Sequence, residues 1–180
     1  ATNYTSIYEL GTYDECGTYN WSVRAYDGFY YGNWSDSWNF SIRPYVALFF
    51  TNDNVDFGDA DTGETNDTTD NNPSPFVIQS DGNVITNVVN VTANQSFFTG
   101  GTARDDDFQL KVDNSTEIGA FNWTASATSW INVTTMQMII SSLQWHDTND
   151  TAEIDVKVHV PIDEPPGLKI TGLVFYGEQR

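Results

Sequence analysis

The stretch Thr18–Pro44, TYNWSVRAYDGFYYGNWSDSWNFSIRP, decides how the rest of the chain is interpreted. Within Tyr19–Ala25 every second side chain is large or apolar, and the same alternation returns in Trp38–Ile42. Alternation with a period of two predicts strands that have one apolar and one polar face. The glycine-containing segment Asp27–Gly32 separates the two strands, so the stretch predicts a β-hairpin. Because a lone two-stranded hairpin is marginal in water, we expect something else to cover its aromatic face.

The composition limits the classes of function. The 180 residues include 39% hydrophobic and 14% aromatic side chains, which is enough to build a core. The formal charge of −18 repels phosphate backbones and anionic lipid heads, so we expect neither nucleic-acid binding nor peripheral membrane binding. No apolar run has the length of a membrane span, so we expect no membrane insertion. The single cysteine, Cys16, cannot form an intramolecular disulfide. The chain begins at Ala1 without a secretion signal, which favours a processed mature form or a piece of something longer.

The strongest statistical signal is the number of acceptor triplets for N-linked sugars, Asn-x-Ser/Thr. They are far more frequent than random placement of the asparagines would give, and several asparagines alternate with apolar neighbours, which predicts that they face outward. We therefore expect N-linked glycans, an export route and an extracellular location at the cell surface. The acceptors are Asn3, Asn20, Asn33, Asn39, Asn66, Asn90, Asn94, Asn114, Asn122, Asn132 and Asn149. Those expected to face outward from strands include Asn90, Asn122 and Asn132.

Further strands are predicted after a boundary at Pro44, which separates residues 1–44 from residues 45–180. They are Tyr45–Thr51, Asn54–Gly58, Phe76–Gln79, Val84–Ala93, Phe108–Val112, Ala120–Thr124, Met136–Leu143, Glu153–Val160 and Leu168–Tyr176. No window shows a helical period, so the fold class is all-β, an antiparallel β-sandwich. The proline-rich connection Pro161–Gly167 predicts that the last two strands form a hairpin.

The run from Leu10 through Cys16–Gly28 to Trp34-Ser35 and Trp38–Ile42 resembles the last three strands of a fibronectin type III or immunoglobulin-like domain. Tyr19 matches the corner tyrosine of that fold. The resemblance covers residues 1–44 only, and the strands that precede these in the family are absent. It therefore implies an incomplete sandwich.

Residues 45–180 resemble secreted β-sandwich domains of archaeal-type surface proteins, and more loosely the subunits of extracellular bundling and biofilm-matrix fibres. The resemblance is carried by Val55-Asp56-Phe57-Gly58, Gly63-Glu64-Thr65, Pro75–Ile78, Asp81–Val84 and the closing Val160–Gly167. In such fibres a strand of one protomer completes the sheet of the next, so the resemblance implies that copies of the chain are its partners.

Chemical motifs are scarce. His146 and His159 neighbour neither a nucleophile motif nor a zinc-spaced cluster, so the sequence indicates no enzyme. Hard oxygen ligands of the kind that Ca²⁺ prefers gather in three places. These are Asp105, Asp106 and Asp107; Asp53, Asp56, Asp59 and Asp61; and Asp147, Asn149 and Asp150. Solvated acidic turns explain the same residues, and both interpretations stay open.

Three aromatic residues, Tyr30, Tyr31 and Trp34, are expected in the hairpin loop. They suit either a contact to a neighbouring subunit or a platform on which surface glycans stack. The sequence thus predicts a structural glycoprotein subunit of an extracellular filament or surface layer, joined head to tail by inter-subunit β-strand addition. The alternative is an adhesin or carbohydrate-binding module of a larger cell-surface protein.

Overall fold

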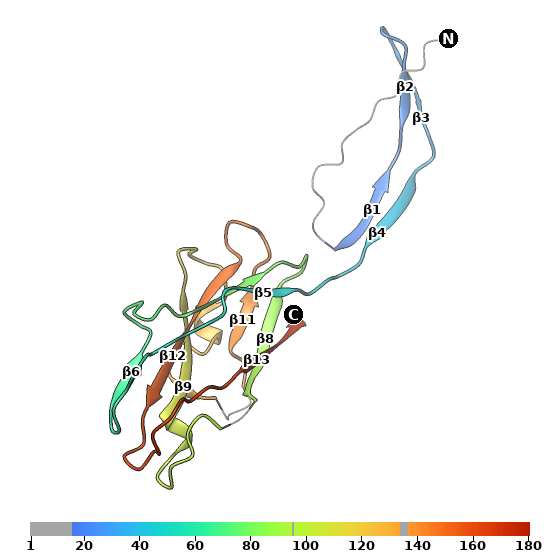
Figure 1. Cartoon of the computed structure of the whole chain (residues 1–180). Coiled ribbons are helices and arrows are strands. Elements are labelled where there is room, and N and C mark those ends of the chain that lie inside the picture. The colour runs from blue at the N-terminus through green and yellow to red at the C-terminus, as the bar shows by residue number, and fades with distance from the viewer. Residues whose placement is uncertain (1–15, 95, 134–136) are drawn as a thin grey trace. The chain divides into compact units, whose positions relative to one another are not determined.

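The computed structural model of the chain describes residues 16–94, 96–133 and 137–180 (Figure 1). In these ranges the regular elements are strands, apart from the short 3₁₀ turns η1 (Asp105–Asp107) and η2 (Trp123–Ala125), and every strand pairing is antiparallel. The predicted all-β fold is confirmed. The chain divides into two compact units, Ala1–Tyr45 and Val46–Arg180.

The first unit contains a two-stranded ribbon in two sections. Strand β1 (Gly17–Trp21) pairs with β4 (Trp38–Ile42), and β2 (Arg24–Tyr26) pairs with β3 (Tyr31–Trp34). The expectation of one unbroken strand over Tyr19–Ala25 is wrong, because the pairing slips between Trp21 and Arg24. There the Ser35 amide donates to the Val23 carbonyl at 2.7 Å, and the Val23 amide donates to the Ser35 hydroxyl at 3.0 Å.

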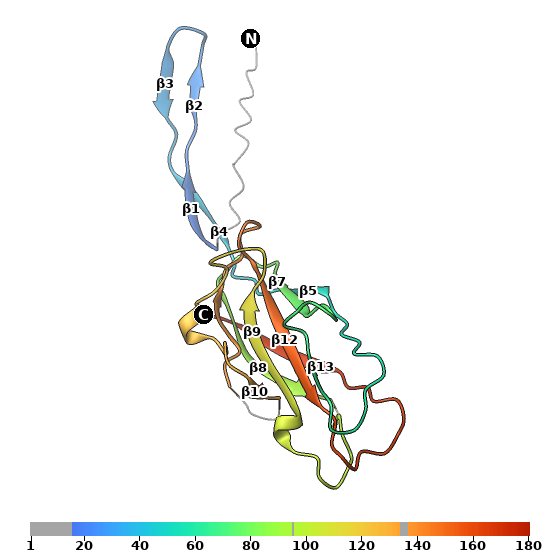
Figure 2. The same cartoon turned by 90° about the vertical axis from the view of Figure 1, so that its left-hand side faces the viewer.

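The second unit is a β-sandwich of two sheets, and Figures 1 and 2 show β8 and β13 layered against β9 and β12. The larger sheet has the order β10 (Ile131–Asn132), β9 (Phe108–Asn114), β12 (Thr151–His159), β7 (Phe76–Ser80) and β5 (Leu48–Asn52), and β6 (Thr65–Asp67) also pairs with β12. The smaller sheet has the order β11 (Ile140–Leu143), β8 (Thr86–Ala93) and β13 (Leu173–Gln179).

The core of the sandwich lies between these sheets. Strand β12 shows why the sequence folds this way: Ile154, Val156 and Val158 are buried in the core, while the intervening side chains project from the outer face. Aliphatic residues of both sheets meet this face and exclude water, which is the main stabilising contribution to the fold. The fully buried members of the core include Ile78, Val88, Leu110, Val112, Ile139, Ile140 and Leu143.

Three expectations about the secondary structure and strand pairing of this unit are wrong. Ala120–Thr124 is not a strand, because Asn122 caps the turn η2 with its side chain. Asn54–Gly58 is irregular, and its Asp56 carboxylate instead accepts a hydrogen bond from the Gly58 amide at 2.8 Å. The last two long strands do not form a hairpin, since β12 pairs within the larger sheet and β13 pairs with β8 in the smaller one.

The connection between β12 and β13 crosses from one sheet to the other and is anchored midway. Glu164 is buried, and its carboxylate accepts hydrogen bonds from the Thr99 amide at 2.9 Å and the Gly100 amide at 2.6 Å. The ammonium group of Lys169 pairs with the same carboxylate. These contacts lower the pKa of Glu164 to about 2 against the opposing effect of burial, so the anchor is an anion at neutral pH. A strand connection fixed in this way does not need the tight turn of a hairpin.

Candidate interaction surface

An aromatic ladder runs along one face of the β1–β4 section of the ribbon. Tyr19 lies opposite Phe40 with ring centroids 5.4 Å apart, and Trp21 lies opposite Trp38 at 4.9 Å. Trp21 is 45% exposed and Trp38 is 46% exposed. Among the described residues of the ribbon, 16–45, none is buried. The ladder therefore stabilises the strand pair across its face, but it leaves two indoles in water.

The opposite face of this section is polar. Asn20 lies directly opposite Asn39, and the hydroxyls of Thr18 and Ser41 lie 2.9 Å apart. Both asparagines are exposed acceptor sites for N-linked sugars. The ribbon thus separates its chemistry by face, with aromatic rings on one side and two adjacent sugar acceptors on the other.

A tight turn closes the ribbon between β2 and β3. The Asp27 carboxylate accepts hydrogen bonds from the amides of Phe29, at 2.9 Å, and Tyr30, at 2.7 Å. Gly28 occupies the turn at a φ of +101°, which side chains other than glycine rarely adopt. The bonds to Tyr30 and Phe29 lower the pKa of Asp27. As a result the turn presents Phe29, 85% exposed, and Tyr30, 78% exposed, to solvent.

Arg24 is held against aromatic rings in the same section. Its guanidinium lies 3.7 Å from the ring centroid of Tyr31 and 4.5 Å from that of Trp34. The Tyr26 ring lies beside that of Tyr31 with centroids 4.5 Å apart and the ring planes tilted by 31°. Cation–π contact keeps the planar guanidinium extended over the rings, so one positive charge is presented on an exposed aromatic platform. The alternation in the sequence predicts that Arg24 lies on the polar face. The spacing of the residues does not predict its contact with Tyr31 and Trp34.

The three aromatic residues expected in the loop lie in different elements. Tyr30 belongs to the turn, whereas Tyr31 and Trp34 are the first and last residues of β3. The expectation that all three sit in the loop is therefore wrong, because β3 begins directly after Tyr30. All three remain exposed, and the structure brings Tyr31 and Trp34 together around the Arg24 guanidinium.

Most of the described acceptor asparagines are accessible. Asn122 is exposed, and its side-chain oxygen accepts from the Thr124 hydroxyl, the third residue of its own triplet, at 3.0 Å. Asn132 is partly buried, and its oxygen accepts from the Gln109 amide at 2.8 Å. The exposed acceptors are Asn20, Asn33, Asn39, Asn94, Asn114 and Asn122; the partly buried ones are Asn66, Asn132 and Asn149. Asn3 lies outside the described residues.

Asn90 contradicts the expectation that it faces outward. It lies in β8 opposite Tyr176 and is only 9% exposed, and its side-chain oxygen has no hydrogen-bond partner within the described residues. The pairing of β8 with β13 shifts between Tyr176 and Gly177, so simple alternation fails at this point. A sugar on Asn90 therefore does not fit the folded strand.

The acidic residues considered for calcium are spread over separate places. Asp105, Asp106 and Asp107 form η1, where the Asp107 carboxylate accepts a hydrogen bond from the Arg104 amide at 2.7 Å and so closes its own turn. In the ranges that the structure describes, no group of three or more acidic, histidine or cysteine side chains is arranged to hold a metal ion. The residues Asp53, Asp56, Asp59 and Asp61 are exposed on irregular segments before β6.

Asp150, a member of the third acidic group, is buried beside β7. One carboxylate oxygen accepts from the Gln79 amide at 3.0 Å, and the other has no partner within the described residues. Burial raises the pKa of Asp150, and the charges of Glu117 and Asp147 raise it further. Glu117 accepts the amides of Asp150 and Thr151 at 2.8 and 2.9 Å. The surroundings of Asp150 thus favour the protonated form of its carboxyl group.

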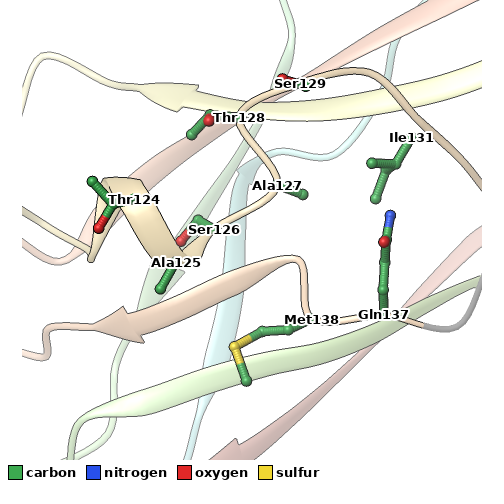
Figure 3. Close-up of a pocket in the computed structure, with 9 residues that line it drawn as sticks. All are labelled: Thr124, Ala125, Ser126, Ala127, Thr128, Ser129, Ile131, Gln137 and Met138. Carbon is green, nitrogen blue, oxygen red and sulfur yellow. The ribbon is translucent and has the colours of Figure 1, made fainter.

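An open hollow of about 260 Å³ lies between the segment after η2 and the start of β11. Figure 3 shows the side chains of Ile131 and Gln137 pointing toward one another across it. Among the described residues, its lining carries no acidic, basic, histidine or cysteine side chain. The lining residues are Thr124, Ala125, Ser126, Ala127, Thr128, Ser129, Ile131, Gln137 and Met138.

Comparison with protein-family models, with curated proteins and with solved structures finds no match. Within the described residues, no helix has the length and apolar character needed to cross a membrane.

Proposed function

We propose that the chain is a structural, non-enzymatic glycoprotein subunit of an extracellular filament or surface layer. Copies join head to tail, and the N-terminal ribbon of one copy adds to a sheet of the next. A contact of this kind uses two different surfaces and does not close on itself, so it generates a linear assembly. The location is the cell surface, and N-linked glycans cover part of each subunit.

The observation that carries this proposal is the exposed aromatic ladder. Trp21 and Trp38 occupy a ribbon only two strands wide, and each remains nearly half exposed. Large exposed apolar patches in soluble proteins mark interaction sites. Two-stranded ribbons also need further strands or a packing partner for stability. A second copy of the chain would cover the exposed indoles and would pair a further strand with the ribbon.

The second unit offers strand edges that a ribbon can extend. Within the described part of the chain, β13 has β8 as its only strand neighbour and ends the smaller sheet. Its seven residues expose Val174 and Tyr176, and no proline interrupts it. Unprotected edges are the usual sites of strand addition. This edge is accordingly the proposed acceptor.

The test compares the self-association of the full chain with that of ribbon variants. Sedimentation velocity and negative-stain microscopy of the wild type are expected to show polymers. Replacing both indoles, in Trp21→Ala/Trp38→Ala, removes the docking face and is expected to leave monomers. The matched control, Thr18→Ala, changes the polar face of the same ribbon, keeps both acceptor triplets, and is expected to polymerise. Monomeric wild-type protein at high concentration would contradict the proposal.

A second candidate function, an adhesin or carbohydrate-binding module, is favoured by the Arg24 platform. Exposed aromatic rings stack on sugar rings, and a guanidinium binds acidic sugars through paired hydrogen bonds. Trp34→Ala removes part of this platform without touching the Trp21–Trp38 ladder. Loss of glycan-array binding in this variant, with polymerisation unchanged, would favour the adhesin.

Calcium binding is proposed for the acidic loops, with Asp105, Asp106 and Asp107 as the first candidates. Carboxylates in loops are the ligands that Ca²⁺ prefers, and the high negative charge of the chain favours cation binding in general. Thermal unfolding with excess Ca²⁺ and with excess chelator tests this. An identical melting temperature under both conditions would contradict it.

A further inference from the structure

A lysine and an aspartate face each other across the centre of the larger sheet. Lys111 on β9 is the direct register partner of Asp155 on β12. The Lys111 Nζ lies 3.0 Å from Asp155 Oδ2, and their side chains are only 16% and 4% exposed. Asp113 Oδ2 contacts the same ammonium group at 3.0 Å.

The pair lies on the outer face of the sheet, and other segments cover it. The Thr68 hydroxyl donates a hydrogen bond to Asp155 Oδ1 at 2.7 Å, and Thr68 itself is fully buried. The ring centroid of Trp130 lies 5.5 Å from Lys111 Nζ. An amine and a carboxyl group are therefore held in contact, with little water, in a fixed orientation. Fixing two reactants in this way raises their effective concentration greatly.

The neighbouring acidic groups suit proton transfer. Glu153 lies two residues before Asp155 and is the register partner of Asp113. Burial raises the pKa of Glu153, and the charges of Asp155 and Asp113 raise it further. The cluster thus contains one carboxyl group, that of Glu153, with a raised pKa, and another, that of Asp113, in contact with the amine.

We propose that Lys111 and Asp155 join in an intramolecular amide bond. Lys111 Nζ attacks Asp155 Cγ, the Nζ–Cγ bond forms, and the bond from Cγ to Oδ2 breaks. The two protons that the ammonium group loses leave with Oδ2 as one water molecule, so the ion pair becomes a neutral amide and no oxidant or energy source is needed. Asp113 transfers the protons from Nζ to the leaving oxygen. The hydrogen bond from Thr68 stabilises the negative charge that develops on Oδ1.

The charge state of Lys111 sets the rate of this reaction. Burial acts to lower the pKa of Lys111, but its hydrogen bonds to Asp113 and Asp155 outweigh that effect and the pKa is raised. The neutral amine that attacks is therefore the minor form at neutral pH. The reaction occurs once in the life of each molecule, so a small reactive population suffices.

The Lys169–Glu164 pair provides an internal comparison. Burial opposes ionisation of Glu164, but the Lys169 ammonium group, two backbone amides and the Thr99 hydroxyl hold it as an anion with a pKa of about 2. A carboxylate stabilised in this way is a poor electrophile. We expect no amide at this pair, although its two charged groups are also in contact.

Intact mass spectrometry of the full chain, produced in a host without N-glycosylation, tests the proposal. The folded wild type is expected to be lighter than its sequence by the mass of one water molecule, and a digest is expected to contain one branched peptide that joins Lys111 to Asp155. Lys111→Arg and Asp113→Ala are expected to show the full mass. Lys169→Arg, the matched control, is expected to keep the deficit.

Two results would overturn the amide. One is a wild-type chain of full mass, which leaves Lys111 and Asp155 as an ion pair only. The other is a deficit that persists in Lys111→Arg, which assigns the lost water to a different site, such as a succinimide at Asp81-Gly82. A variant that folds poorly also shows the full mass. The deciding measurement is therefore the branched peptide in the digest of the wild type, which does not depend on the folding of any variant.

Discussion

Trp21 and Trp38 lie directly opposite each other on β1 and β4, with ring centroids 4.9 Å apart, and neither is buried. A tryptophan pair of this kind contributes to strand pairing through ring contact and still retains a large apolar area in water. Their exposure distinguishes the ribbon from the sandwich, where the large aliphatic side chains of the core are fully enclosed.

The first prediction concerns the accessibility of this pair. In hydroxyl-radical footprinting of the monomeric chain, Trp21 and Trp38 are expected to react faster than Trp130 and Trp145, which are partly buried. In assembled material the two ribbon indoles are expected to become protected, while Trp130 keeps its rate. Peptide mass mapping gives the rate for each residue. Equal rates for Trp38 before and after assembly would contradict docking through the ladder.

The second prediction concerns the anchor of the β12–β13 connection. Glu164→Ala leaves the partly buried amides of Thr99 and Gly100 without their acceptor, and a loss of this kind costs about 1–3 kcal/mol. The variant is expected to lower the free energy of unfolding by about that amount, measured in urea. The neighbouring Pro165→Ala, at an exposed position, serves as the control and is expected to change little.

The same anchor predicts a dependence on pH. The pKa of Glu164 falls from 4.5 to about 2 on folding, so its ionised form is favoured in the folded chain. Its contribution to stability is complete above the ordinary pKa and is lost as the pH falls through about 2. Urea unfolding at a series of acid pH values is expected to show this loss in the wild type and not in Glu164→Ala.

The third prediction concerns Asp150, whose pKa is raised on folding, whereas that of Glu164 is lowered. The folded chain raises the pKa of Asp150, so the protonated form is favoured and the stabilising contribution is lost as the pH rises through the folded pKa. Asp150→Asn keeps an acceptor for the Gln79 amide and removes the buried charge. It is expected to raise the melting temperature at neutral pH and to matter less in acid. An unchanged or lower melting temperature at pH 7 would contradict this account.

The fourth prediction separates the stability of the sandwich from that of the ribbon. Leu110→Ala opens a cavity at a fully buried position, which typically costs about 2–5 kcal/mol. Trp21→Ala removes a larger side chain from the exposed ladder and is expected to leave the main unfolding transition unchanged. Chemical denaturation monitored by circular dichroism compares the two variants. A similar destabilisation by both would show that the ribbon contributes to the core transition.

The fifth prediction concerns sugar occupancy. Glycopeptide mapping of native material is expected to find sugars at exposed acceptors, among them Asn20, Asn39 and Asn122, and none at Asn90. Burial in β8 leaves no room for a sugar at Asn90 once the strand has formed. Occupancy at Asn90 comparable to that at Asn39 would contradict the register of β8 and β13.

Much of the fold could be predicted from local pattern. Strand β12 follows the alternation of Glu153–Val160, because one face packs on the core and the other carries charged groups. The alternation of apolar and polar residues did not predict the face of a side chain where the pairing of a strand changes register. The slip between Trp21 and Arg24 and the shift at Gly177 each move side chains to a different face, and neither has a signal in a single sequence.

Long-range pairing was the least predictable part of the molecule. The connection Pro161–Gly167 has the composition of a turn, but the buried Glu164 anchors it to Thr99 and Gly100, which lie far away in the chain. The Arg24 platform was missed for a similar reason, because alternation gives the face of a side chain and not its partner. The acceptor triplets could be read directly, since they are defined by adjacent residues.

Asn20 and Asn39 are direct register partners on the side of the ribbon away from the rings. When both carry sugars, that side becomes a hydrated brush that holds other molecules at a distance, whereas the ring side stays bare. In the proposed filament, sugars on this side would prevent lateral contact between filaments and leave the ring side free for the next subunit. Enzymatic removal of these two sugars is then expected to let separate filaments associate side by side.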